Sequence, residues 1–174
     1  MPVLGPPPIT AAELARKIRS DSDPSWDWGE RPIKNLLYEL GCGYGLAFCR
    51  KNGLAEGVDV QEWMLDLVWM DKKGAIGLAV ESELQSSKKG LIDDFLKLMV
   101  IKAPLKLFIY KSKNALNTLT PYLKDFPQHL EGEEYLLMDV GKGHADFYHY
   151  KVPNSGSVSD VVFTPLQFGL GSSA

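Results

Sequence analysis

The sequence predicts an α/β fold in which a mixed central sheet is flanked by helices, with a hairpin near the C-terminus. Two apolar segments, 63–70 and 75–84, lie on either side of a short turn and predict a pair of antiparallel strands. A segment of helical periodicity at 91–102 and a short apolar segment at 105–110 follow directly. That order predicts a crossover helix that returns the chain to the same sheet.

Length and composition limit the protein classes to consider. The chain has 174 residues, of which 45% are hydrophobic, and this is the size of one domain with a substantial core. It has no apolar run long enough to span a membrane and no basic segment leading into an apolar one, so we expect a cytoplasmic protein. Cys42 and Cys49 lack the spacing of metal ligands and lie in an apolar stretch, so they are expected to be buried free thiols rather than a disulfide.

The N-terminal region predicts an arm and then a short helix. Residues 1–9 are rich in proline and predict an extended arm. Thr10 can cap a helix over 11–19, and Glu13 would complete a capping box with it. Because this helix has few large apolar residues, we expect it to lie on the surface.

A second helix and a strand are expected before the central strand pair. The helix covers 32–40, with Pro32 in its first turn and Gly41 after its end. Residues 44–50 predict the first strand of a three-strand meander. The intervening Gly-Cys-Gly-Tyr-Gly segment follows a helix and precedes a strand, the reverse of the order in dinucleotide-binding loops, which excludes that function.

The turn between the two apolar strands determines which of their side chains face each other. Glycine is the strongest choice for the second position of a two-residue hairpin loop, so residues 73–74 are expected to form the loop. Pairing outward from that loop in an unbroken register places Met70 opposite Gly77. Further along, Val68 lies opposite Ala79.

The same register brings acidic side chains together. Asp66 would lie opposite Glu81, and Glu83 would share the face of Glu81 because side chains alternate along a strand. Opposed carboxylates destabilise a sheet, and buried ones cost free energy, unless a cation neutralises them. Three converging acids therefore predict a site for a hard divalent cation, with Mg²⁺ as the best fit. The alternative is that the acids are solvated residues which protect a strand edge.

With the following helix and strand, these residues resemble the PD-(D/E)XK nuclease superfamily, whose members have a restriction-endonuclease-like fold. The resemblance covers residues 30–111 and implies a core of a helix, a three-strand meander, a crossover helix and a fourth strand. It implies that Asp66 and Glu81 bind the metal. Glu83 stands where the motif has lysine, which is a departure from the pattern. The expected order in a single domain, 1–174, is an arm (1–9), the nuclease-like core (30–111), a helix and terminal hairpin (112–152) and a tail (153–174).

The resemblance also suggests two helical residues for the site. Some members carry the lysine on the helix after the motif, which makes Lys97 a candidate for stabilising charge on the phosphate. Glu39 is the candidate for an acid on the first helix that binds a second metal or orients water, with Glu30 as its alternative. Ordinary helix-surface charge is the competing explanation for both glutamates.

Lysines are concentrated near the proposed acids, although the whole chain has a net charge of −3. Within 26 residues these are Lys88, Lys89, Lys97, Lys102, Lys106, Lys111 and Lys113. A metal site surrounded by lysines suits a phosphodiester substrate, whereas any one of them taken singly is better explained as a solvated surface residue.

The C-terminal part predicts a helix, a hairpin and a tail. Residues 114–124 predict a helix that Pro121 weakens midway. Segments 134–140 and 145–152 alternate apolar and polar residues and predict the two strands of a hairpin. The tail, 153–174, is expected to end in a terminal strand or in an arm docked on a second subunit.

The resemblance implies a nuclease dependent on Mg²⁺ or Mn²⁺ that hydrolyses phosphodiester bonds of nucleic acid. Within it Glu83 would be a third ligand or the general base. DNA ranks before RNA as the partner, no membrane partner is expected, and a homodimer fits because nucleases of this fold often work as dimers. Two alternatives stay open: a catalytically inactive nuclease-fold module for binding or assembly, and a scaffold protein with incidental acids.

Overall fold

One mixed sheet organises the residues that the computed structural model describes, which are 7–21, 30–49, 65–85, 87–141, 144–153, 158 and 160–168. Its strands are β1 (Ala47–Cys49), β2 (Leu67–Met70), β3 (Ile76–Glu83), β4 (Leu105–Tyr110), β5 (Glu134–Gly141), β6 (His144–Lys151) and β7 (Thr164–Pro165). The helices are α1 (Ala11–Asp21), α2 (Glu30–Gly43), α3 (Lys88–Val100) and α4 (Ala115–Asp125). These seven strands are hydrogen-bonded in the order of the sequence. The predicted α/β class is confirmed.

The strand directions show how the chain builds this sheet. β1, β2 and β3 form an antiparallel meander, whereas β3, β4 and β5 are parallel. Parallel neighbours need a crossover connection, and α3 and α4 provide the two that are required. β6 pairs antiparallel with β5 in the expected hairpin. The expected succession of helix, three-strand meander, crossover helix and fourth strand is therefore present from α2 to β4.

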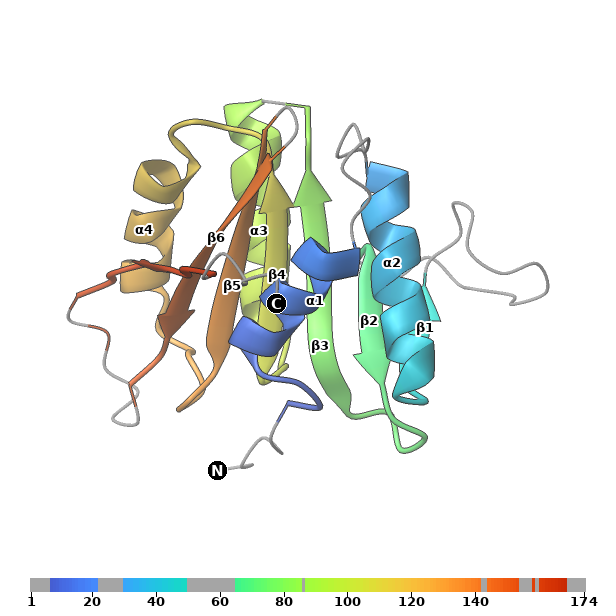
Figure 1. Cartoon of the computed structure of the whole chain (residues 1–174). Coiled ribbons are helices and arrows are strands. Elements are labelled where there is room, and N and C mark those ends of the chain that lie inside the picture. The colour runs from blue at the N-terminus through green and yellow to red at the C-terminus, as the bar shows by residue number, and fades with distance from the viewer. Residues whose placement is uncertain are drawn as a thin grey trace.

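Helices cover both faces of the sheet (Figure 1). α1 and α2 pack on one face, and α3 and α4 pack on the other. β4 lies between these layers, and all six of its residues are buried. Leu107 belongs to the core under α1 and α2, whereas Phe108 belongs to the core under α3 and α4. Burial on both faces explains the nearly continuous apolar run of this strand.

The first helix begins as expected and buries one of its faces. The backbone N–H of Thr10 donates to Glu13 Oε2 at 3.1 Å, and the N–H of Glu13 donates to Thr10 Oγ1 at 3.2 Å, which confirms the capping box. Glu13 and Lys17 are exposed, as expected for a helix at the surface, whereas Leu14, Ala15 and Ile18 form an inner face that is fully buried. Alanine extends the apolar stripe of α1 without adding bulk, so a count of large apolar residues underestimated its packing face.

The hairpin turn is one residue longer than predicted. It spans residues 72–74 and is closed by Asp71, whose N–H donates to the Ala75 carbonyl at 2.9 Å. The carboxylate of Asp71 accepts the N–H groups of Lys73 and Ala75 at 2.8 and 2.9 Å. This side-chain cap stabilises the longer loop. Gly74 adopts a φ of 83°, which confirms why glycine is needed there.

The longer turn changes the register only beside the loop. Met70 lies opposite Ile76 instead of Gly77, and the register shifts between Trp69 and Met70. Beyond that irregularity Val68 lies opposite Ala79 as predicted. A bulge thus absorbs the extra loop residue, and the register towards the acidic end of the strands is preserved.

Several element boundaries differ from the predictions. α2 begins before and ends after its expected range, and β1 is shorter than expected because Tyr44 and Gly45 form a turn after α2. α3 begins three residues earlier than expected, where Ser87 Oγ accepts the N–H of Gly90 at 2.9 Å. The outer part of the expected strand 63–70 lies beyond the described residues, and Asp66 is in a bend just before β2.

The C-terminal region contributes a terminal strand. β7 pairs with β6, and Leu166 N–H donates to the Phe147 carbonyl at 2.9 Å. Of the two expectations for the tail, a terminal strand is therefore the one found, while docking on a second subunit stays a prediction. None of the helices in the described ranges is long and apolar enough to cross a membrane.

A buried ionic network connects the other end of the parallel strands to the helices. Lys106 Nζ lies 2.9 Å from Glu133 Oε2, and both side chains are 1% exposed. The same ammonium donates to the Met99 carbonyl at the end of α3 and to the Tyr135 hydroxyl. His129 Nδ1 lies 2.6 Å from Glu133 Oε1. Lys106, expected near the acids, is thus a structural residue.

The network keeps Glu133 charged in spite of its burial. Burial alone would raise the pKa of this carboxyl group, but the hydrogen bond from His129 and the charge of Lys106 outweigh it and lower the pKa. A lowered acid pKa stabilises the fold above the ordinary value of 4.5, and the contribution is lost as pH falls through the folded-state pKa.

We expect Lys106→Met to reduce the free energy of unfolding by about 3 kcal/mol at pH 7, because the substitution leaves Glu133 buried without its ammonium partner. Urea unfolding monitored by circular dichroism measures this loss. Lys102→Met, at an exposed lysine beyond α3, is the control and should change stability little. Equal stabilities of the two variants would show that the buried pair contributes nothing.

Candidate metal centre

Glu81 is a buried carboxylate near the end of β3, on the face that α3 covers. Only 3% of its surface is exposed, and its Oε1 has no hydrogen-bond partner among the described residues. Burial, and then the nearby negative charge of Asp66, raise the pKa of Glu81 to about 8. A buried polar atom without a partner destabilises the fold, so its position needs a reason other than stability.

Asp66 reaches the same strand from the bend before β2. Its Oδ2 accepts two hydrogen bonds from Ser82, from the backbone N–H at 2.9 Å and from the hydroxyl at 2.6 Å. Its Oδ1 lies 2.9 Å from Lys34 Nζ of α2. The carboxylate is therefore held on both oxygens beside Glu81, the neighbourhood that the preserved register predicts.

α3 adds a second charged pair to this site. Lys97 Nζ lies 2.6 Å from Asp94 Oδ1, one turn earlier in the helix. Lys97 lowers the pKa of Glu81 while Asp94 raises it, so both lie within electrostatic range of the buried acid. The pKa of Lys97 is itself raised, first by the hydrogen bond to Asp94 and further by the charges of Glu81 and Asp66. The crossover from β3 to β4 places this face of α3 over Glu81.

Glu83 lies at the same strand end but makes different contacts. Its Oε1 accepts the N–H of Gln85 at 2.5 Å, and its Oε2 lies against Gly90 in the first turn of α3, where a side chain would collide with it. It also lines a cavity of about 310 Å³ together with Lys88 and Lys111. In the described part of the chain, no three acidic, histidine or cysteine side chains gather closely enough to hold a metal ion. Glu83 therefore contacts the residues that follow β3 and the start of α3, while its expected part in a metal site stays a prediction.

Glu39 is directed towards a different region. It is exposed on α2 and lines a surface hollow with Lys17 and Asp21 of α1. The residue of α2 that reaches the acids is Lys34, which sequence reasoning missed. Local spacing gave no signal for it, because the contact depends on how α2 packs against the end of β2. The side chain of Glu30, the alternative acid, is outside the described residues.

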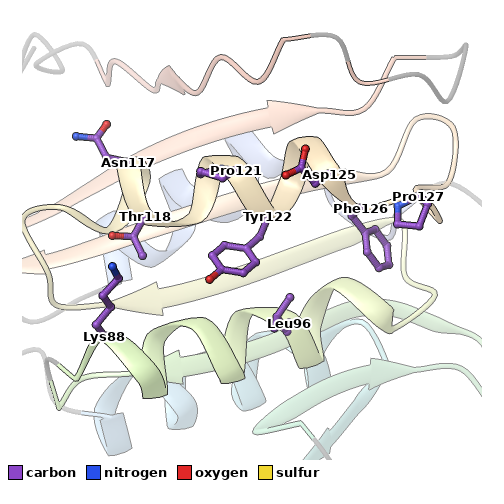
Figure 2. Close-up of a pocket in the computed structure, with 9 residues that line it drawn as sticks. All are labelled: Lys88, Leu96, Asn117, Thr118, Pro121, Tyr122, Asp125, Phe126 and Pro127. Atoms are coloured by element: carbon purple, nitrogen blue, oxygen red, sulfur yellow. The ribbon is translucent and has the colours of Figure 1, made fainter.

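A groove between α3 and α4 is lined by residues of both helices (Figure 2). Its volume is about 620 Å³, and Leu96 and Tyr122 extend into it from the two helices. Phe126 and Pro127 line it near the end of α4, and Lys88 lines it near the start of α3. Asp66 and Glu81 do not line this groove. The volume of a pocket and the concentration of charged side chains therefore indicate two different candidate sites. We base the chemistry on the charged site.

Comparison with known proteins does not assign a family. A scan against protein-family models finds no match for this chain, and a search of the curated proteins finds none. The relationship to the PD-(D/E)XK superfamily therefore stays a prediction. Function has to be inferred from the chemistry of Asp66, Glu81 and their neighbours.

We expect Glu81→Gln to stabilise the metal-free protein at pH 8. Glu81 titrates near 8 when folded and near its ordinary value of 4.5 when unfolded, so its contribution to stability falls as pH rises between these values. The difference amounts to a few kcal/mol, at about 1.4 kcal/mol per pKa unit. Urea unfolding in a chelator, from pH 5 to pH 8, should show the variant gaining on the wild type as pH rises. Parallel pH profiles would contradict the raised pKa.

Proposed function

We propose that this protein is a metal-dependent nuclease that hydrolyses phosphodiester bonds of nucleic acid, with Asp66 and Glu81 as its metal ligands. The observation that carries the proposal is the buried carboxylate of Glu81, whose Oε1 has no partner among the described residues. A second carboxylate lies next to it and further raises its pKa. Two carboxylates that destabilise each other are expected where a cation binds.

The chemistry of the two acids fits Mg²⁺ or Mn²⁺. Both cations accept carboxylate oxygens, and Mg²⁺ in particular is held by one or two carboxylates together with water and substrate phosphate. Glu81 and Asp66 would hold the ion through their carboxylate groups. When bound, the ion would polarise a phosphate oxygen and lower the pKa of coordinated water.

The remaining residues of the site would orient and balance charge. Ser82 fixes the carboxylate of Asp66 through two hydrogen bonds to Oδ2, while Oδ1 pairs with Lys34 in the metal-free protein. Lys97 would stabilise negative charge that develops on the phosphate. Its salt bridge to Asp94 keeps the ammonium near the acids. Glu83 is given no metal contact, since its carboxylate faces the start of α3.

Nucleic acid is the substrate class that these charges favour. Lys88 and Lys111 line the cavity next to Glu83, at the strand end that also carries Glu81. Lysines near a metal site suit a chain of phosphates, and their contacts make binding sensitive to salt. We rank DNA before RNA as the substrate, and the assay below includes both.

The second candidate is an inactive nuclease-fold module that binds nucleic acid or protein. Glu83, in place of the motif lysine, favours it. The ion pair between Asp66 and Lys34 also favours it, because it satisfies the first acid without a metal. This candidate predicts metal binding or nucleic-acid binding without cleavage.

We expect purified protein to cleave fluorescently labelled DNA or RNA in Mg²⁺ or Mn²⁺, and Asp66→Asn or Glu81→Gln to reduce the rate at least about 100-fold. Each substitution removes a charged ligand and leaves the side-chain size unchanged, and loss of metal-assisted charge stabilisation has effects of this order. Gel electrophoresis of the products measures the rate.

Glu131→Gln, at an exposed acid in the loop before β5, is the matched control and should cleave like the wild type. Cleavage that survives in Asp66→Asn would refute the assignment of the site. Metal binding without cleavage of either nucleic acid would favour the inactive module.

A further inference from the structure

Lys34 pairs with one carboxylate oxygen of Asp66, a proposed metal ligand. Its Nζ lies 2.9 Å from Asp66 Oδ1, and the two side chains are 18% and 21% exposed. The other oxygen, Oδ2, already accepts two hydrogen bonds from Ser82. The partner at Oδ1 is therefore the easier one to displace. The Lys34 ammonium is on a flexible side chain and can move away, whereas the backbone N–H of Ser82 is fixed in β3.

We propose that Lys34 is a built-in counter-cation of the metal-free site and that a divalent ion displaces its ammonium from Asp66. This inference rests on the proposed metal-binding function. It assigns Lys34 a role in setting metal affinity, in addition to the two ligands.

Charge repulsion gives the physical reason for displacement. An ammonium and a divalent cation on the same oxygen would lie a few ångströms apart, and like charges at that distance repel strongly in a partly buried site. The ion can bind only after the ion pair between Lys34 and Asp66 is broken. A partly exposed ion pair of this kind contributes modestly, so its competition should weaken metal binding by about tenfold.

The location of Lys34 explains why this lysine, rather than Lys97, has the role. Lys34 comes from α2, in the layer on one face of the sheet, whereas Lys97 comes from α3 on the other face. Lys97 forms its salt bridge with Asp94 at 2.6 Å. A metal that replaces Lys34 at Asp66 thus leaves the proposed phosphate-binding lysine in place.

The test is a calorimetric titration of the metal-free full chain with Mn²⁺ alone. We expect Lys34→Met to bind Mn²⁺ about tenfold more tightly than the wild type, because the competing cation is removed. Lys34→Arg keeps the positive charge and should bind no more tightly than the wild type. Lys102→Met, which also removes one positive charge but at an exposed site beyond α3, controls for net charge.

Folding of each variant is checked by circular dichroism before the titration, and Lys34→Gln replaces Lys34→Met if the latter does not fold. In the absence of metal, Lys34→Met should also melt at a lower temperature than the wild type, since Asp66 loses its ion pair with Lys34. A purely structural ion pair would produce that lower melting temperature without any gain in Mn²⁺ affinity.

Two results would overturn the inference, and they are distinguishable. If wild type binds Mn²⁺, Glu81→Gln does not, and Lys34→Met binds equally or more weakly, the metal site stands and displacement of Lys34 is refuted. If neither the wild type nor Lys34→Met binds Mn²⁺, the proposed metal-binding function fails together with it. Tighter binding in Lys34→Met but not in Lys34→Arg or Lys102→Met supports the proposal.

Discussion

Burial of the Glu81 carboxyl group is the constraint on which the candidate site depends. The side chain faces the helical layer formed by α3 and α4. Its partner on the adjacent strand β4 is Phe108, which belongs to the apolar core of that layer. An apolar residue there would avoid the desolvation that raises the pKa of Glu81 to about 8. The chain places an acid at this point and surrounds it with Asp66, Asp94 and Lys97. Such an arrangement favours a charged ligand over a stable empty site.

Two buried polar centres in the same helical layer show the difference between structural and functional burial. Both carboxylate oxygens of Glu133 have hydrogen-bond partners, which are Lys106, His129 and Tyr135. Around Glu81, Oε1 has no hydrogen-bond partner within the described ranges. A fully satisfied network fixes helices to the sheet, whereas an unsatisfied carboxylate stores unfavourable free energy that a ligand can relieve.

The topology explains why the charged groups meet at one end of the sheet. β2 is antiparallel to β3, so the bend at its start lies beside the end of β3, and Asp66 reaches Ser82 there. The parallel return to β4 requires a crossover, and α3 therefore lies over the face that carries Glu81. Packing of α2 on the opposite face brings Lys34 to Asp66. Four segments that are separate in the sequence, namely α2, the bend before β2, β3 and α3, thus supply one site.

The sequence by itself determined the α/β class, the meander with its crossover and the capping box at Thr10. The predicted register also sets Asp66 near Glu81, although a bulge compensates for a loop one residue longer than predicted. These features follow from periodicity, turn chemistry and alternation, which act over a few residues and are visible in a linear pattern. Only the tertiary structure decided that α1 buries a complete apolar face, that Lys106 belongs to a buried network and that Glu83 faces the start of α3. It alone brought Lys34 to Asp66. The physical reason is that these outcomes depend on which faces of distant helices pack against the sheet, and spacing along the chain carries no information about that packing.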